Sequence, residues 1–237
     1  NMTQYLLAAI PLFIFMASML EKSGVIEEVF DVAYKWLGRI PGGLAVATVV
    51  ASTVLAAMVG VIGAAVVTMA LVALPSMLRR GYSPVLAVGT VMAGGTLGIL
   101  IPPSVLAIVY GLVANQSVGE LYLGSVFPGL VLSGLYILFS VGYALLNPKA
   151  APRLSPEETP TWSERWRALR SIWSPLVLIF LVLGTIFLGL AAPTEAAAIG
   201  AFGAMVVAAI HRRLSWTILR LALAQTAKAT AMVMWIV

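Results

Sequence analysis

The longest uncharged stretch of the chain, residues 42–78, most constrains how it can fold. Its 37 positions hold no Asp, Glu, Lys, Arg or His. One straight helix of this length would run for about 55 Å, against about 30 Å for the hydrocarbon core of a bilayer. Gly60 and Gly63 lie near its middle, and glycine both disfavours a helix and permits a tight reversal. We therefore expect two helical arms joined at residues 60–63.

Basic residues indicate on which side of the membrane these arms end. Arg39 precedes the stretch, and Arg79 and Arg80 follow it. Because short cytoplasmic segments are enriched in Lys and Arg, both ends are predicted to be cytoplasmic. Two full spans and one re-entrant hairpin both satisfy this pattern, and a re-entrant backbone is tolerated only where protein or a cavity surrounds it.

A second uncharged stretch, residues 85–113, contains the most specific pattern in the chain, GGTLGILIPPS at 94–104. Pro102 and Pro103 both lack an N–H, and each pushes the residue before it away from the helical conformation. A helix must therefore break at this point. The simpler alternative is a proline kink that neighbouring helices repair.

The glycines before the two prolines, Gly94, Gly95 and Gly98, are expected to loosen the preceding turns of the helix. Backbone carbonyl and amide groups would then become available near the middle of the bilayer. Such groups are costly in hydrocarbon unless they bind something. This cost is the first indication of a binding site.

Composition and charge exclude several classes of protein. With 61% hydrophobic residues, 10% charged residues and a mean hydropathy of +1.04, the chain is too apolar to be a soluble, secreted or disordered protein. The net charge of +5 could indicate nucleic-acid binding, but the basic residues lie in short loops between apolar stretches. We expect a lipid bilayer as the surrounding medium and no nucleic-acid partner.

Catalytic chemistry is also not expected. The apolar stretches carry no ionisable acid, base or Lys, and the chain has no Cys, so neither an enzyme nor a protein-bound cofactor is predicted. The single histidine, His211, stands beside Arg212 and Arg213 at a predicted helix end. This position favours a partner of the helix dipole or a solvated residue, without a functional role.

The expected fold class is an all-α integral membrane protein, a multi-span helical bundle with a re-entrant hairpin and a Gly/Pro-broken helix. The chain opens on Asn1 without a signal-peptide pattern and closes on an apolar run, so we expect a longer parent protein. The first predicted segments are a scaffold helix with an amphipathic arm helix (1–41) and a first transport repeat (42–113), which contains the hairpin (42–78) and the broken helix (85–113). A returning span (114–146), a cytoplasmic basic loop (147–174) and two further spans (175–213) follow. A second interfacial arm helix over 214–228 starts a truncated second repeat (214–237).

The two breaks are the candidate site, because half-helix N-termini attract anions and unwound carbonyls coordinate cations near the midplane of transporters. The candidate ion- and substrate-binding residues are Gly60, Gly63, Ala64, Thr68, Gly94, Gly95, Thr96, Pro102, Pro103 and Ser104.

Residues Thr194 and Glu195, in the segment PTEAAA, form a weaker candidate. They suit an ordinary helix start, with Thr194 as the cap and Glu195 favoured by the helix dipole. The alternative is that this helix start faces the transport site.

Five segments of the chain resemble the large membrane subunit of tripartite ATP-independent periplasmic (TRAP) transporters, and together they cover about the middle half of such a subunit. These segments are IPLFIFMASMLEKSGV, GAAVVTMALVALPSMLRRGYSP, GGTLGILIPPS, SVGELYLGSVFPG and APTEAAAIGA. The resemblance implies an elevator-type, Na⁺-coupled importer of carboxylates in the bacterial inner membrane. It also implies two partners, a small membrane subunit and a periplasmic substrate-binding protein.

The resemblance further implies that the hairpin tip, near Gly60 to Ala64, faces the break at Leu100 to Ser104 across a Na⁺ site. Many family members have a serine-rich tip, whereas this chain has Gly60-Val61-Ile62-Gly63-Ala64. Coordination would then fall to backbone carbonyls, near Gly60, Gly63, Gly95 and Ile101. Two alternatives stay open: another elevator-type anion symporter, and a non-transporting membrane scaffold whose glycines only permit close helix packing.

Overall fold

A computed structural model describes residues 6–60, 62–153 and 160–236, and every regular element in these ranges is an α-helix. This confirms the all-helical fold class. The helices are α2 (Ala9–Lys22), α3 (Val25–Leu37), α4 (Gly43–Val59), α5 (Ile62–Arg79), α6 (Pro84–Leu100), α7 (Val105–Ala114), α8 (Val118–Leu146), α9 (Trp162–Ser171), α10 (Trp173–Phe187), α11 (Pro193–Ile210) and α12 (Trp216–Ile236).

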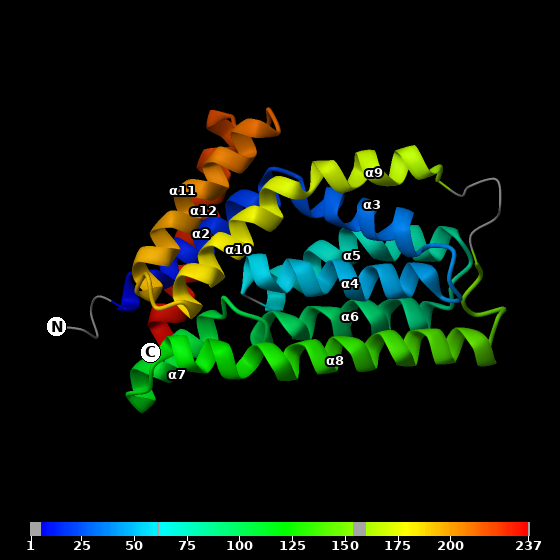
Figure 1. Ribbon diagram of the computed structural model, residues 1–237, viewed down its shortest axis with the longest axis horizontal. Coiled ribbons are helices and arrows are strands. Elements are labelled where there is room, and N and C mark those ends of the chain that lie inside the picture. The colour runs from blue at the N-terminus through cyan, green and yellow to red at the C-terminus, as the bar shows by residue number, and fades with distance from the viewer. Residues whose placement is uncertain (1–5, 61, 154–159, 237) are drawn as a thin grey trace.

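The helices form two groups that cross each other (Figure 1). Helices α4, α5, α6 and α8 run side by side, and we call them the long bundle. Helices α2, α10, α11 and α12 form the crossing bundle, in which α2 packs against both α11 and α12. Helix α3 packs along α4, and α9 covers α3. Glu27 and Asp31 on α3 are exposed, whereas Val29 and Phe30 are buried, so α3 is amphipathic, as predicted.

Three segments are long and apolar enough to cross a membrane: α6 with α7 (Pro84–Ala114), α8 and α11. Two more spans result if α2 with α3, bent by 64°, and α9 with α10, bent by 46°, are each counted as one. The apolar part of each hairpin arm is shorter, 17 residues or fewer (Gly43–Val59 and Ala65–Arg79). These lengths belong to a multi-pass membrane protein that also contains apolar helices somewhat shorter than a full span.

Small residues allow the hairpin arms to approach α6 closely. A Cβ added at Gly94 would overlap the Ser52 side chain of α4, and one at Gly95 would overlap the Val66 side chain of α5. Helix α6 continues unbroken through both glycines to Leu100. The expectation that these glycines loosen the turns is therefore wrong, because they serve helix packing instead.

The predicted cytoplasmic loop at 147–174 contains a helix, α9, which sequence reasoning did not predict. Thr161 caps α9 by accepting a hydrogen bond from the Glu164 N–H, and the Glu164 carboxylate accepts one from the Thr161 N–H, 2.7 Å away. This reciprocal pair is a capping box, and it satisfies backbone donors at the helix start. Trp36 of α3 packs edge-on against Trp166 of α9, which anchors the helix.

The C-terminal segment also differs from its prediction. We expected a separate interfacial helix over residues 214–228, but α12 continues without interruption from Trp216 to Ile236 and packs against α2. The physical reason is that no glycine or proline interrupts residues 216–236.

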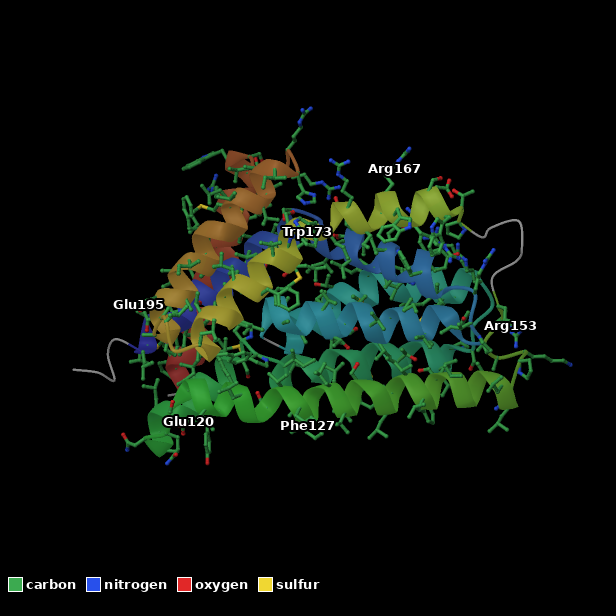
Figure 2. All side chains as sticks on the ribbon, viewed as in Figure 1. Glu120, Phe127, Arg153, Arg167, Trp173 and Glu195 are labelled. Atoms are coloured by element: carbon green, nitrogen blue, oxygen red, sulfur yellow. The ribbon has the colours of Figure 1, made fainter. Side chains whose placement is uncertain are left out.

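Two basic and two acidic residues outside the apolar stretches lie on opposite sides of the molecule (Figure 2). Figure 2 shows Arg153 and Arg167 on one side and Glu120 and Glu195 on the other. This separation fits the predicted topology, with the basic segments facing the cytoplasm.

Candidate functional site

The reversal of the hairpin occurs at Gly60. This residue has a left-handed backbone (φ 61°), and its N–H donates to the Ala56 carbonyl over 3.3 Å at the end of α4. Glycine adopts this conformation without the steric cost that other residues meet. Helix α5 begins at Ile62, while Val61 and the side chain of Ala64 lie outside the described part of the chain. The tip is therefore tight, and its polarity comes from the backbone.

The predicted break after α6 is present at residues 101–104. The Ile101 N–H still donates to the Leu97 carbonyl over 2.9 Å, but its backbone is extended. Pro102 and Pro103 follow, joined by a cis peptide. Ser104 then starts α7, and its hydroxyl accepts a hydrogen bond from the Ala107 N–H at 3.4 Å. The break thus separates α6, which ends at Leu100, from α7, which begins at Val105.

The hairpin tip and the break lie against each other. The Val105 N–H, at the start of α7, donates to the Gly60 carbonyl over 3.3 Å. A Cβ on Gly60 would overlap the Pro103 carbonyl oxygen. The carbonyl ends of α4 and α6 therefore meet the amide ends of α5 and α7, and we call this contact the junction. Carbonyl ends carry partial negative charge and amide ends partial positive charge, so the junction could hold both a cation and an anion.

A tyrosine that sequence reasoning missed supports the junction. Tyr122 of α8 is completely buried, and its hydroxyl donates to the Ser104 carbonyl over 3.2 Å. A buried phenol normally finds a hydrogen-bond partner. A Tyr within an apolar span was the available signal, although it did not identify the partner.

The hydroxyl candidates are spread along the arms. Ser104 is buried within the junction. Thr96 lies one turn before the break on an exposed face, where its hydroxyl bonds the Ala93 carbonyl (2.7 Å) and the Tyr136 hydroxyl (3.3 Å). Thr68 is buried in the second turn of α5. Gly63 is exposed, and a Cβ there would meet open space. Backbone groups of the break and Gly60 therefore form the centre of the candidate site.

The weaker candidates, Thr194 and Glu195, lie at the start of α11 in the crossing bundle. The cap residue is Ala192, so the prediction of Thr194 as the cap is wrong: Pro193 takes the first helical position, which its fixed φ favours, and thereby moves Thr194 inside the helix. The Glu195 carboxylate accepts a hydrogen bond from the Ala192 N–H over 2.9 Å. Helix α11 packs mainly against α2 and α10, so Glu195 serves this helix start.

A second polar site, which we call the polar corner, joins α3 to the crossing bundle. The Glu28 carboxylate lies 3.1 Å from His211 Nδ1 and 3.0 Å from Arg213 Nη2. Arg213 also donates to the Ser23 carbonyl, and His211 Nε2 lies 2.9 Å from the Ser174 hydroxyl. Among the described residues, Glu28 Oε2 accepts no hydrogen bond, so its contact with His211 is a close approach at ion-pair distance.

His211 was predicted to be a partner of the helix dipole or a solvated residue, and the structure places it at the C-cap of α11, where a dipole partner is expected, with its side chain largely out of solvent. Its side chain is only 11% exposed, and it lies between Glu28 and Ser174. Within the described ranges, no three His, Asp or Glu side chains gather as a metal site would require. Cation binding in this part of the chain would therefore depend on backbone oxygen atoms, with Ser or Thr hydroxyls in support.

The sequence was compared with known families. The profile of the family described as "Tripartite ATP-independent periplasmic transporter, DctM component" matches residues 1–237. Three curated relatives are similar over most of this chain. The C4-dicarboxylate TRAP transporter large permease protein DctM of Pseudomonas aeruginosa is 36% identical over 98% of this chain and 54% of its own length. The Vibrio cholerae protein of the same name is 37% identical over 86% of the chain and 44% of its length.

The third relative has a different substrate in its name. The ectoine TRAP transporter large permease protein TeaC of Halomonas elongata is 32% identical over 81% of this chain and 44% of its own length. The chain therefore spans about half the length of the curated relatives it matches.

Proposed function

This chain belongs to the DctM component family of TRAP transporters, and from that premise we propose that it is the part of a permease that imports a small organic acid with a Na⁺ gradient. The observation that carries the proposal is the junction. It brings four helix ends together at Gly60 and residues 101–105, within stretches that have no ionisable acid or base. Helix ends are the remaining source of charge for holding an ion and a charged solute there.

The cation side of the proposal rests on carbonyl oxygens. Hard cations take oxygen ligands, and the carbonyl ends of α4 and α6 present such oxygens at Gly60 and near Ile101. The glycine-rich tip offers no serine oxygen, so Gly60 and its neighbours would bind Na⁺ through the main chain. Carbonyls near Gly63 and Gly95 are less suitable, because both residues lie within regular helices whose carbonyls are shared with the next turn.

The anion side of the proposal rests on amide groups. The first N–H groups of α5 and α7 have no partner within their own helices, and two of them, at Val105 and Ala107, already donate to the Gly60 carbonyl and the Ser104 hydroxyl. A carboxylate would find the same type of donor. The relatives are named for C4-dicarboxylates and for ectoine, which supports a small organic acid with a carboxylate as the substrate class.

The partners follow from the family and remain part of the proposal. We infer a small membrane subunit and a periplasmic substrate-binding protein in the bacterial inner membrane, because the family is named for a tripartite periplasmic system. The family assignment favours transport over the scaffold alternative.

The test is uptake by proteoliposomes that contain the complete permease, its small membrane subunit and its binding protein. Radiolabelled succinate and ectoine would be supplied outside, with a Na⁺ gradient, a K⁺ gradient of the same size, or a pH gradient. We expect uptake of one substrate only with Na⁺ and only with the binding protein. Equal uptake with K⁺ would reject Na⁺ coupling, and uptake without the binding protein would favour the other class of anion symporter.

A matched pair of variants connects the result to the junction. Gly60→Ala should abolish uptake, because its Cβ overlaps Pro103, while Gly63→Ala should retain it, because a Cβ there meets open space. Equal activity of the two variants would remove the junction from the mechanism, whichever ion drives transport.

A further inference from the structure

A groove of about 600 Å³ lies along the long bundle, on the seam between α6 and α8. Its size falls within the range of about 300–1,000 Å³ that is usual for sites of small ligands. Within this chain, which spans about half the length of its relatives, the groove is open to the side: Val85, Leu135 and Phe139 on its walls are 80%, 55% and 64% exposed. The proposed transport function does not use this groove.

The lining of the groove is mainly apolar, and its hydroxyl-bearing residues are Thr90, Tyr136, Ser140 and Tyr143. The Tyr136 hydroxyl lies 3.3 Å from the Thr96 hydroxyl. The Thr90 hydroxyl donates to the Leu86 carbonyl over 2.7 Å, and the Ser140 hydroxyl donates to the Tyr136 carbonyl over 2.8 Å. Both donors are used within their own helices. The groove therefore offers little to a polar solute and suits a hydrocarbon chain.

The length of the groove matches one leaflet of a bilayer. It extends along α8 from Leu132 to Tyr143, eleven residue steps, or about 16 Å at 1.5 Å per residue. The hydrocarbon core of a bilayer is about 30 Å thick, so one leaflet is about 15 Å.

One end of the groove reaches a basic rim. The groove is lined by Val85 in the first turn of α6 and by Tyr143 in the last turn of α8. The Ser83 N–H donates to the Ala150 carbonyl over 2.9 Å, so the segments before α6 and after α8 lie together at this end.

These two segments, residues 79–85 and 143–153, contain basic but no acidic residues. Arg79, Lys149 and Arg153 are exposed there, and Figure 2 shows Arg153 beyond the end of the long bundle. Basic segments of this kind attract anionic lipid headgroups on the cytoplasmic side of a membrane, and Arg153 also lines a neighbouring hollow with Pro41 and Ala144.

We propose that this groove is a binding site for an anionic phospholipid of the cytoplasmic leaflet. One acyl chain lies between α6 and α8, and the phosphate lies at the rim formed by Arg79, Lys149 and Arg153. The bound lipid fills the seam and stabilises the packing of α6 on α8. The proposed lipid site requires that the protein lies in a membrane, whatever solute it transports and whatever ion drives it.

The experiment uses the complete permease purified in mild detergent, with co-purified phospholipid identified by native mass spectrometry. Gly89 lines the groove, and a Cβ there would meet open space, so Gly89→Leu fills the groove without a clash in this part of the chain. Gly142→Leu on α8 is the matched control, because its Cβ also meets open space and it does not line the groove. Both changes favour the helix.

We expect wild type and Gly142→Leu to retain a tightly bound phospholipid and Gly89→Leu to lose it. Retention of the same amount by Gly89→Leu would overturn the proposal. Replacing Lys149 and Arg153 with Gln should reduce the preference for phosphatidylglycerol over phosphatidylcholine, measured in added vesicles, by roughly fivefold for each charge removed. An unchanged preference would overturn the headgroup assignment.

A photo-crosslinking residue at Phe139 of otherwise unaltered permease provides a test that does not depend on the folding of Gly89→Leu. Capture of phospholipid supports the proposal. Capture of another segment of the same polypeptide or of the small membrane subunit would overturn it, because the groove would then be a protein interface.

Discussion

The junction and the polar corner both hold distant segments together, but through different kinds of polar contact. Both join segments that are distant in the sequence through polar contacts among apolar helices. At the junction the contact between Val105 and Gly60 is entirely backbone, and no charged side chain takes part. At the polar corner the Glu28 carboxylate pairs with the Arg213 guanidinium and lies 3.1 Å from His211 Nδ1.

The difference follows from location. The junction lies within uncharged stretches, where an ionisable side chain would be costly, whereas the polar corner lies near helix ends beside basic residues. A backbone contact can be exchanged for an ion or a carboxylate without leaving a buried charge behind. A side-chain ion pair cannot be released as cheaply. We therefore interpret the junction as the adaptable contact and the polar corner as the fixed one.

The largest effect is expected at the junction, from Gly60→Ala. The variant places a Cβ at a left-handed position (φ 61°) against the Pro103 carbonyl. Backbone strain and overpacking together should lower the free energy of unfolding by roughly 2–5 kcal/mol. Thermal unfolding in detergent measures the change, with Gly63→Ala as the control. A Gly60→Ala protein as stable as the control would mean that the tip does not rest on the break.

The second-largest effect is expected where α6 packs against α4, near the junction. Gly94→Ala should lower the free energy of unfolding by roughly 1–3 kcal/mol, since the new Cβ overlaps Ser52. Combining it with Ser52→Gly removes the overlapping atoms, so the double variant should recover part of the loss as a coupling energy. Purely additive effects in the double-variant cycle would contradict the close approach of α4 and α6.

A smaller effect is expected at the polar corner. Glu28→Gln leaves Arg213 without its carboxylate partner and should cost about 1–2 kcal/mol of stability. Lys35→Gln breaks the more exposed Lys35–Asp31 pair within α3 and should change stability by no more than about 0.5 kcal/mol. If the two variants unfold at the same temperature, the polar corner is not a fixed contact.

The smallest effect expected is a dependence of the stability of α9 on pH. The hydrogen bond from the Thr161 backbone, assisted by the Thr161 hydroxyl, lowers the pKa of Glu164 below its ordinary value. The folded state therefore binds this proton less readily than the unfolded state. The resulting stabilisation is present above the ordinary pKa, about 4.3, and is lost as the pH falls through the lower folded value.

Glu164→Gln should remove this dependence on pH while leaving the Thr161 hydroxyl cap in place. Circular dichroism of wild type and variant between pH 3 and pH 7, taken at roughly one-unit steps around the Glu pKa, measures it. A wild-type protein whose acid response matches that of Glu164→Gln would contradict the role of the capping box.

Several local features were predictable because they depend on residues close in the sequence. The break at Pro102 and Pro103 follows from the missing N–H groups, which no packing can restore. The reversal near Gly60 follows from a stretch too long for one span. Helix α9 was missed, although Thr161 and Glu164 have the spacing of a capping box, because its basic residues suggested a loop.

The sequence by itself determined which segments are apolar, where two helices must break and that no ionisable side chain lies in those segments, since each of these depends on covalent structure and local sterics. Only the tertiary structure decided that Gly60 rests on the break, that Gly94 and Gly95 pack rather than loosen α6, and that His211 faces Glu28. Contacts between distant segments depend on how whole helices pack, and a residue pattern does not specify which of the available faces will meet.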